Sequence, residues 1–116
     1  MDFSNLQPQF PQFTGKDYDV WAIKMATTLQ AHDVWDYVKF GFSEPMNEEE
    51  KQAFTNAERE QWKKDKKKNA HALQLNQQGV DLAVLQKIIT MSSTKVAWDT
   101  LVKNYKCMAK VNIVKL

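Results

Sequence analysis

The chain has 116 residues and a formal net charge of +2, with 43% hydrophobic and 26% charged residues. This composition fits one globular domain and excludes a chain that is disordered throughout. The single cysteine, Cys107, excludes an internal disulfide, and no apolar run reaches the ~18 residues that a membrane span needs. Residues 1–5 also lack the basic and apolar regions of a secretory signal. We therefore expect one domain without a membrane partner in a reducing compartment, which is the cytoplasm and, in addition, the nucleus.

Residues 1–15 are predicted to form an extended N-terminal arm, because two prolines and Gly15 interrupt any regular helix. Three phenylalanines are spaced along this arm: Phe3, Phe10 and Phe13. So many aromatic side chains in one short segment predict that it packs on a partner surface. That surface is either the arm's own domain or a neighbouring subunit.

Two helices are predicted to follow, over residues 17–32 and 33–40. The first contains apolar residues every four positions, which form one stripe on a helix: Trp21, Met25 and Leu29. In the second, Asp33 is the expected N-cap, and Gly41 lies just past the expected C-terminus.

Residues 48–78 have helical composition and are predicted to form a long helix that ends at Gly79, with a break near residues 55–58. Its expected buried face is Ala70, Leu73 and Gln77. The middle of the helix carries a run of five lysines: Lys63, Lys64, Lys66, Lys67 and Lys68.

Residues 81–90 are predicted to form a further core helix with Leu82, Leu85 and Ile89 on its buried face. A last helix is expected after the cap Ser92-Ser93-Thr94, and its apolar face consists of Ala97, Trp98, Leu101 and Tyr105. Residues 109–116 form a largely apolar segment, which predicts the start of another helix. This predicts that the sequence is the first part of a longer protein.

Together these elements predict an all-α fold, a compact bundle of about five to six helices. The expected organisation is an arm over residues 1–15, a helical domain over 16–108 and a truncated helix over 109–116. Three tryptophans lie on apolar helix faces and are expected in the core rather than in a ligand cage: Trp21, Trp35 and Trp98.

We expect neither a catalytic residue nor a cofactor. His32, His71 and Cys107 are far apart in the sequence and lack the spacing of metal ligands, so no metal site is predicted. Glycine-rich phosphate loops and nucleophile elbows are absent from the sequence. The sequence therefore predicts a protein that is not an enzyme.

Two features suggest binding. The lysine run is either a solvated helix face or a set of non-specific phosphate contacts to RNA. Trp62 lies among charged residues, so that, if exposed, it is a candidate interface anchor together with the arm phenylalanines.

Charge is divided unequally along the chain. Residues 1–50 carry three basic and nine acidic residues, whereas residues 51–116 carry thirteen basic and five acidic residues. A subunit with one acidic and one basic half favours head-to-tail association with copies of itself.

The order of aromatic and small residues resembles the Gag polyproteins of plant copia-type LTR retrotransposons. Residues 13–25 match the pattern Phe-x-Gly-x-x-Tyr-x-x-Trp-x-x-x-Met, which is followed by Leu29, Asp33-x-Trp35-x-x-Val38 and Gly41. A second block comprises Ala97-Trp98-Asp99-Thr100-Leu101 and Tyr105. The motif residues that we assign to the core are Tyr18, Trp21, Met25, Leu29, Trp35, Val38, Trp98, Leu101 and Tyr105.

The resemblance implies a capsid N-terminal-type domain that self-associates during particle assembly. The zinc knuckle and protease of the full polyprotein are absent from this sequence. An alternative is a host Gag-like protein that binds a partner peptide or protein in an apolar groove, with weak non-specific RNA binding. Deleting residues 1–12 is expected to open such a groove.

Overall fold

A computed structural model describes residues 10–106, which contain six α-helices, one π-helical segment and no β-strand beyond an isolated bridge. The predicted all-α bundle is confirmed. The elements are α1 (Tyr18–Ala31), α2 (Trp35–Phe40), α3 (Glu48–Gln52), α4 (Asn56–Gln78), α5 (Leu82–Ile88), α6 (Thr94–Leu101) and the π-helix η2 (Val102–Lys106).

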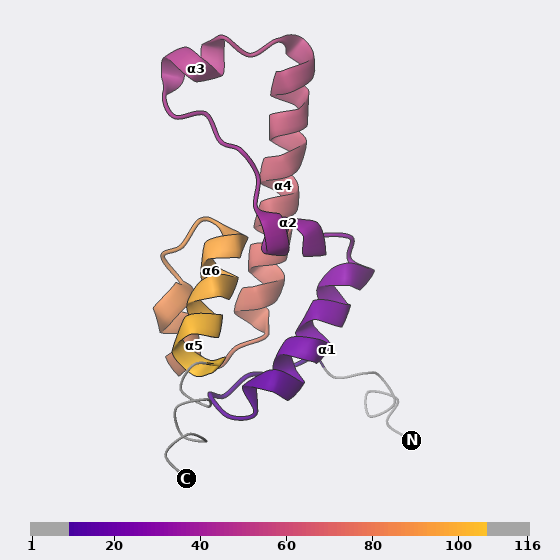
Figure 1. The fold of residues 1–116 in the computed structure, drawn as a ribbon, viewed down its shortest axis with the longest axis vertical. Helices are drawn as coiled ribbons and strands as arrows, with labels where there is room; N and C mark the ends of the chain where they lie inside the picture. Colours follow the sequence, from indigo (N-terminus) through magenta and orange to yellow (C-terminus); the bar gives the residue numbers. More distant parts are fainter. Residues whose placement is uncertain (1–9, 107–116) are drawn as a thin grey trace, which may run out of the picture.

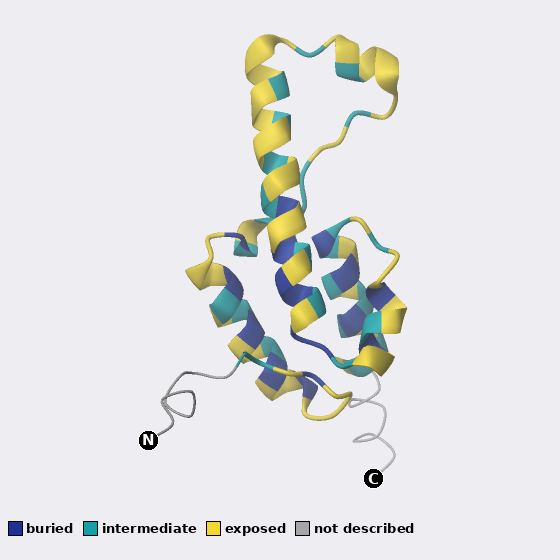
Figure 2. Ribbon diagram, turned by 180° about the vertical axis from the view of Figure 1, so that it is seen from behind, coloured by how far each residue is buried: buried dark blue, intermediate teal, exposed yellow. Residues whose placement is uncertain are grey.

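The molecule consists of a packed body and a projection (Figure 1). From here on, this projection is called the arm, and the predicted arm of residues 1–15 is called the N-terminal segment. The C-terminal half of α4 runs through the body between α1 on one side and α5 and α6 on the other, and α2 packs on α4 and α6. The N-terminal half of α4 leaves the body and carries α3 at its far end, and this arm is mostly exposed (Figure 2). The body therefore contains the hydrophobic core.

The chain before α1 is part of the body. The backbone N–H of Phe13 donates to the carbonyl oxygen of Gly79 at 2.8 Å, and the N–H of Asp81 donates to the carbonyl oxygen of Phe13 at 2.9 Å. The Phe13 side chain is 0% exposed, and Phe10 packs against the core. The sequence left open whether these phenylalanines pack on their own domain or on a neighbouring subunit. The structure shows that Phe10 and Phe13 pack on their own domain, and Phe13 is not free to contact another molecule. Phe3 and residues 107–116 lie outside the described residues.

Phe13 lies at the centre of an aromatic cluster. Its ring centroid is 5.0 Å from that of Trp21, 4.7 Å from Tyr105 and 5.7 Å from Tyr18. Trp98 extends the cluster, because its ring lies 5.5 Å from that of Trp21. Burial, with smaller contributions from two nearby aspartates, raises the pKa of Tyr18 to about 12, so that its hydroxyl stays protonated at neutral pH.

The turn between α1 and α2 differs from the prediction. Asp33 is not the N-cap of α2 but adopts a left-handed conformation with φ 60°. The N–H of Asp33 donates to the carbonyl oxygen of Gln30, and the N–H of Val34 donates to that of Leu29. This pair of bonds is the Schellman arrangement that terminates a helix. Asp33 therefore ends α1, a position that Asp tolerates because its short polar side chain can bond locally.

The predicted long helix is divided at residues 53–55 into α3 and α4, slightly before the expected interval. Thr55 is the N-cap of α4: its hydroxyl accepts from the N–H of Glu58, and the Glu58 carboxylate accepts from the N–H of Thr55. These bonds from Thr55 lower the pKa of Glu58, since they favour the charged carboxylate. This reciprocal cap starts a new helix close to the break that the sequence predicted.

The buried face of α5 was predicted wrongly. Leu82 and Ile89 are 69% and 49% exposed, whereas Val84 and Ile88 are buried and Leu85 is half-buried. Val80 pairs with Phe13 just before the helix, which orients the chain so that positions 80, 84 and 88 face the core. The contact with the N-terminal segment thus selects the face of α5.

The buried face of α4 also differs, because it is partly polar. Ala70 is exposed, and Leu73 and Gln77 are half-buried. The buried residues are Asn69, Ala72, Leu75 and Asn76. Both asparagines are held by hydrogen bonds to the start of α6, so a pattern of apolar residues could not identify this face.

Candidate functional site

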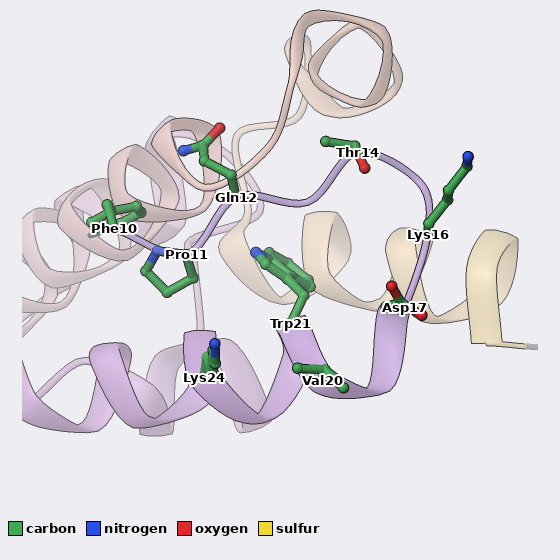
Figure 3. A pocket seen from close by; sticks show the side chains of 9 residues that line it. All are labelled: Phe10, Pro11, Gln12, Thr14, Lys16, Asp17, Val20, Trp21 and Lys24. Carbon is green, nitrogen blue, oxygen red and sulfur yellow. The ribbon is translucent and has the colours of Figure 1, made fainter. Parts of the chain in front are cut away.

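A groove of about 440 Å³ lies between the N-terminal segment and α1 (Figure 3). Its apolar lining comes from Phe10, Pro11 and Val20, and Lys16 and Lys24 supply positive charge. In Figure 3, Lys24 rises from α1 near Pro11, whereas Lys16 lies at the other end beside Asp17. Asp17 is the carboxylate of the lining and lies beside Lys16. The ammonium group of Lys24, at the other end of the groove, therefore has no carboxylate of the lining beside it.

Trp21 forms the floor of this groove. Its ring stands up from α1 toward the N-terminal segment, with the nitrogen edge on the side of Pro11 and Lys24 (Figure 3). The Nε1–H group is buried and has no acceptor among the described residues. An unpaired buried donor is unfavourable by about 1–3 kcal/mol. The Trp21 N–H is therefore an unsatisfied donor buried beneath the groove.

A second hollow, of about 500 Å³, lies where the end of α1 meets the middle of α4. His32 Nδ1 and His71 Nε2 are 3.2 Å apart at this hollow, although the sequence separates them widely. Its lining also includes the three lysines Lys64, Lys67 and Lys68. Residues 10–106 contain no group of three or more side chains suited to bind a metal. Three ammonium groups beside two imidazoles instead favour an anion.

The lysine run does not form one continuous face. Lys63 pairs with Glu60 at 3.8 Å, and Lys68 pairs with Asp33 at 3.8 Å. Lys66 lies on another side of α4, with its Nζ 4.7 Å from the ring centroid of Trp62. The structure therefore gathers three of the five predicted RNA-contact lysines in the hollow. Lys63 lies with Lys64 and Lys67 at an adjoining hollow, and only Lys66 is directed to another side of the helix.

Trp62 connects the two helices of the arm. Its ring centroid lies 6.1 Å from that of Phe54, and the Nζ atom of Lys51 in α3 lies 5.0 Å from it. The residue is half-buried by these contacts. Only part of the side chain is left for the interface that was predicted, and its main contact is within the chain.

The residues assigned to the Gag-like motif meet in one core, although they come from four elements. Trp35, Trp98 and Tyr105 are half-buried against this core, and the others are buried: Tyr18, Trp21, Met25, Leu29, Val38 and Leu101. The motif therefore describes residues that pack together and leaves the surface unspecified. Sequence reasoning did not identify the groove or the histidine pair, because both depend on contacts between distant segments.

Part of the chain matches a known protein family. Residues 13–39 match a family described as a domain of unknown function (DUF4219). No curated protein and no solved structure is significantly similar to the chain. Among the helices of residues 10–106, none combines the length and the apolar character needed to cross a membrane.

Proposed function

We propose that this chain is a structural, Gag-like domain of a copia-type plant retrotransposon that associates with copies of itself during particle assembly. The observation that carries the proposal is the residue pattern of positions 13–41, which resembles such Gag polyproteins; residues 13–39 of this segment match DUF4219. The motif in the second half of the chain supports it, since Trp98, Leu101 and Tyr105 pack on the matched segment.

The charge distribution also supports self-association. The arm ends in α3, which begins with three exposed glutamates, whereas five lysines lie on α4 and two line the groove beside α1. Opposite charges at separate places on one subunit can pair between copies.

The test is a concentration series of the whole chain by analytical ultracentrifugation. We expect the average mass to rise with protein concentration at low ionic strength. The association should weaken with added salt, since the screening length falls from about 10 Å at 0.1 M to about 3 Å at 1 M. A mass that stays at the monomer value up to the highest concentration at low salt would contradict the proposal.

Non-specific RNA binding is a second candidate, favoured by the hollow that holds Lys64, Lys67 and Lys68 beside two histidines. Changing these three lysines to glutamine should weaken binding to single-stranded RNA. The slope of log affinity against log salt should fall by about two, at ~0.7 for each phosphate contact. Fluorescence anisotropy over a salt series measures both quantities.

The matched control removes three exposed lysines elsewhere: Lys39, Lys87 and Lys103. RNA binding at the hollow is contradicted if the control loses as much affinity as the hollow variant. It is also contradicted if the unmodified chain shows no binding at ~50 mM salt, where phosphate contacts dominate.

A further inference from the structure

The tip of the arm carries an exposed apolar side chain beside negative charge. Met46 is 87% exposed, the highest value among the large exposed hydrophobic residues. It lies just before α3, where Asn47 caps the helix by accepting from the N–H of Glu50. A single exposed apolar side chain is common on protein surfaces, so the charges beside Met46 decide what this tip can contact.

The glutamates of α3 differ in their contacts. Glu48 lies 3.9 Å from Lys51, and Glu50 accepts from the N–H of Met46 at 3.3 Å. Glu49 forms neither an ion pair nor a side-chain hydrogen bond with any residue of the described range. Its carboxylate is therefore the one at this tip that is free to bind another group.

The arm presents this tip in a defined position. Lys51 of α3 lies over the ring of Trp62 in α4, and Phe54 in the connecting turn packs against the same ring. The body end of the arm is fastened as well, because the Tyr37 hydroxyl of α2 donates to Asp65 of α4 at 2.8 Å, which raises the pKa of Tyr37. A tip held in this way loses less conformational entropy on binding than a free loop.

The groove beside α1 has the complementary properties. It offers an apolar wall, an ammonium group at Lys24 that forms no ion pair with a described residue, and the indole N–H of Trp21, which needs an acceptor. The tip and the groove lie at opposite ends of the molecule (Figure 1). They cannot meet within one chain, but they can meet between two.

We propose that the arm tip of one copy docks in the α1 groove of the next copy. Met46 packs on Phe10, Pro11 and Val20, and the Glu49 carboxylate pairs with Lys24. Because the two surfaces differ, the contact is head-to-tail and generates open chains or closed rings. This inference rests on the self-association proposed above and identifies its surfaces.

Charge reversal tests the pairing directly. Lys24→Glu and Glu49→Lys each place like charges at the contact, and each should weaken self-association at least tenfold. Both positions are exposed, so folding should be retained, which circular dichroism checks. The double variant Lys24→Glu/Glu49→Lys should associate again, because every junction then has a pair of opposite charges.

An equimolar mixture of the two single variants should also associate, since each reversed tip then meets a reversed groove. The controls are Lys103→Glu and Glu60→Lys, which make the same charge changes at exposed positions away from the contact. The indole N–H resonance of Trp21 provides a second measurement: it should shift with concentration in the unmodified chain and stay constant in either single variant.

The outcomes separate this inference from the proposed function. If the unmodified chain stays monomeric, self-association is wrong and the docking with it. If the unmodified chain associates and the single variants associate equally well, self-association stands and the docking is wrong. The same conclusion holds if self-association is not restored in the mixture of single variants or in the double variant. Recovery in both, with unchanged controls, supports the docking.

Discussion

Phe13→Ala is expected to lower the free energy of unfolding by about 3–5 kcal/mol, the range for truncating a buried phenylalanine. The Phe13 side chain is 0% exposed, and its ring contacts those of Trp21 and Tyr105 at centroid distances of 5.0 and 4.7 Å. Removing the Phe13 ring leaves a cavity between α1, η2 and the N-terminal segment that carries this residue. Urea denaturation followed by circular dichroism measures the loss.

Phe40→Ala is the matched control, because Phe40 is 67% exposed and its removal should change stability by no more than about 0.5 kcal/mol. A similar stability for Phe13→Ala and the unmodified chain would mean that the N-terminal segment is not part of the core. That result would also remove one wall of the groove beside α1.

Asn69→Ala is expected to destabilise the fold by about 2–3 kcal/mol, because it breaks two hydrogen bonds and leaves a buried donor unpaired. The Asn69 amide donates to the carbonyl oxygen of Ser92 at 2.8 Å, and its oxygen accepts from the buried N–H of Thr94 at 2.9 Å. For a domain of about 100 residues, each kcal/mol lowers Tm by roughly 4–8 °C. Thermal unfolding therefore resolves the effect clearly.

Two further variants identify the cause. Asn69→Asp keeps an acceptor for Thr94 but buries a carboxylate oxygen against the carbonyl oxygen of Ser92, so at neutral pH its Tm should be no higher than that of Asn69→Ala. Its Tm should rise as the pH falls, because the protonated carboxyl group can donate to Ser92. Gln74→Ala, at an exposed position of the same helix, should leave Tm nearly unchanged. An unchanged Tm in Asn69→Ala would show that α6 is not fastened to α4 by this side chain.

Local signals predicted much of the fold. The four-residue spacing of Trp21, Met25 and Leu29 predicted the buried stripe of α1, and all three are buried. Gly79 ends α4 as expected, and Ser93 caps α6 by accepting from the N–H of Val96. These features depend on residues within a few positions of one another, so a sequence contains the information they need.

Features that join distant segments could not be predicted in this way. The face of α5 depends on Val80 pairing with Phe13, and the polar face of α4 depends on Asn69 reaching Ser92 and Thr94. The groove beside α1 has the same origin, because its walls are α1 and a segment positioned by the pairing of Phe13 with Val80.

The sequence by itself determined the helical class, most helix ends and the aromatic residues of the motif, because helix periodicity and capping act over a few residues. Only the tertiary structure decided which faces of α4 and α5 are buried and that His32 meets His71. It also decided that Trp62 joins α3 to α4. Those outcomes follow from packing between distant segments. This packing placed the glutamates of α3 at a projecting tip, Lys64, Lys67 and Lys68 at a hollow, and Lys16 and Lys24 of the acidic half at a groove.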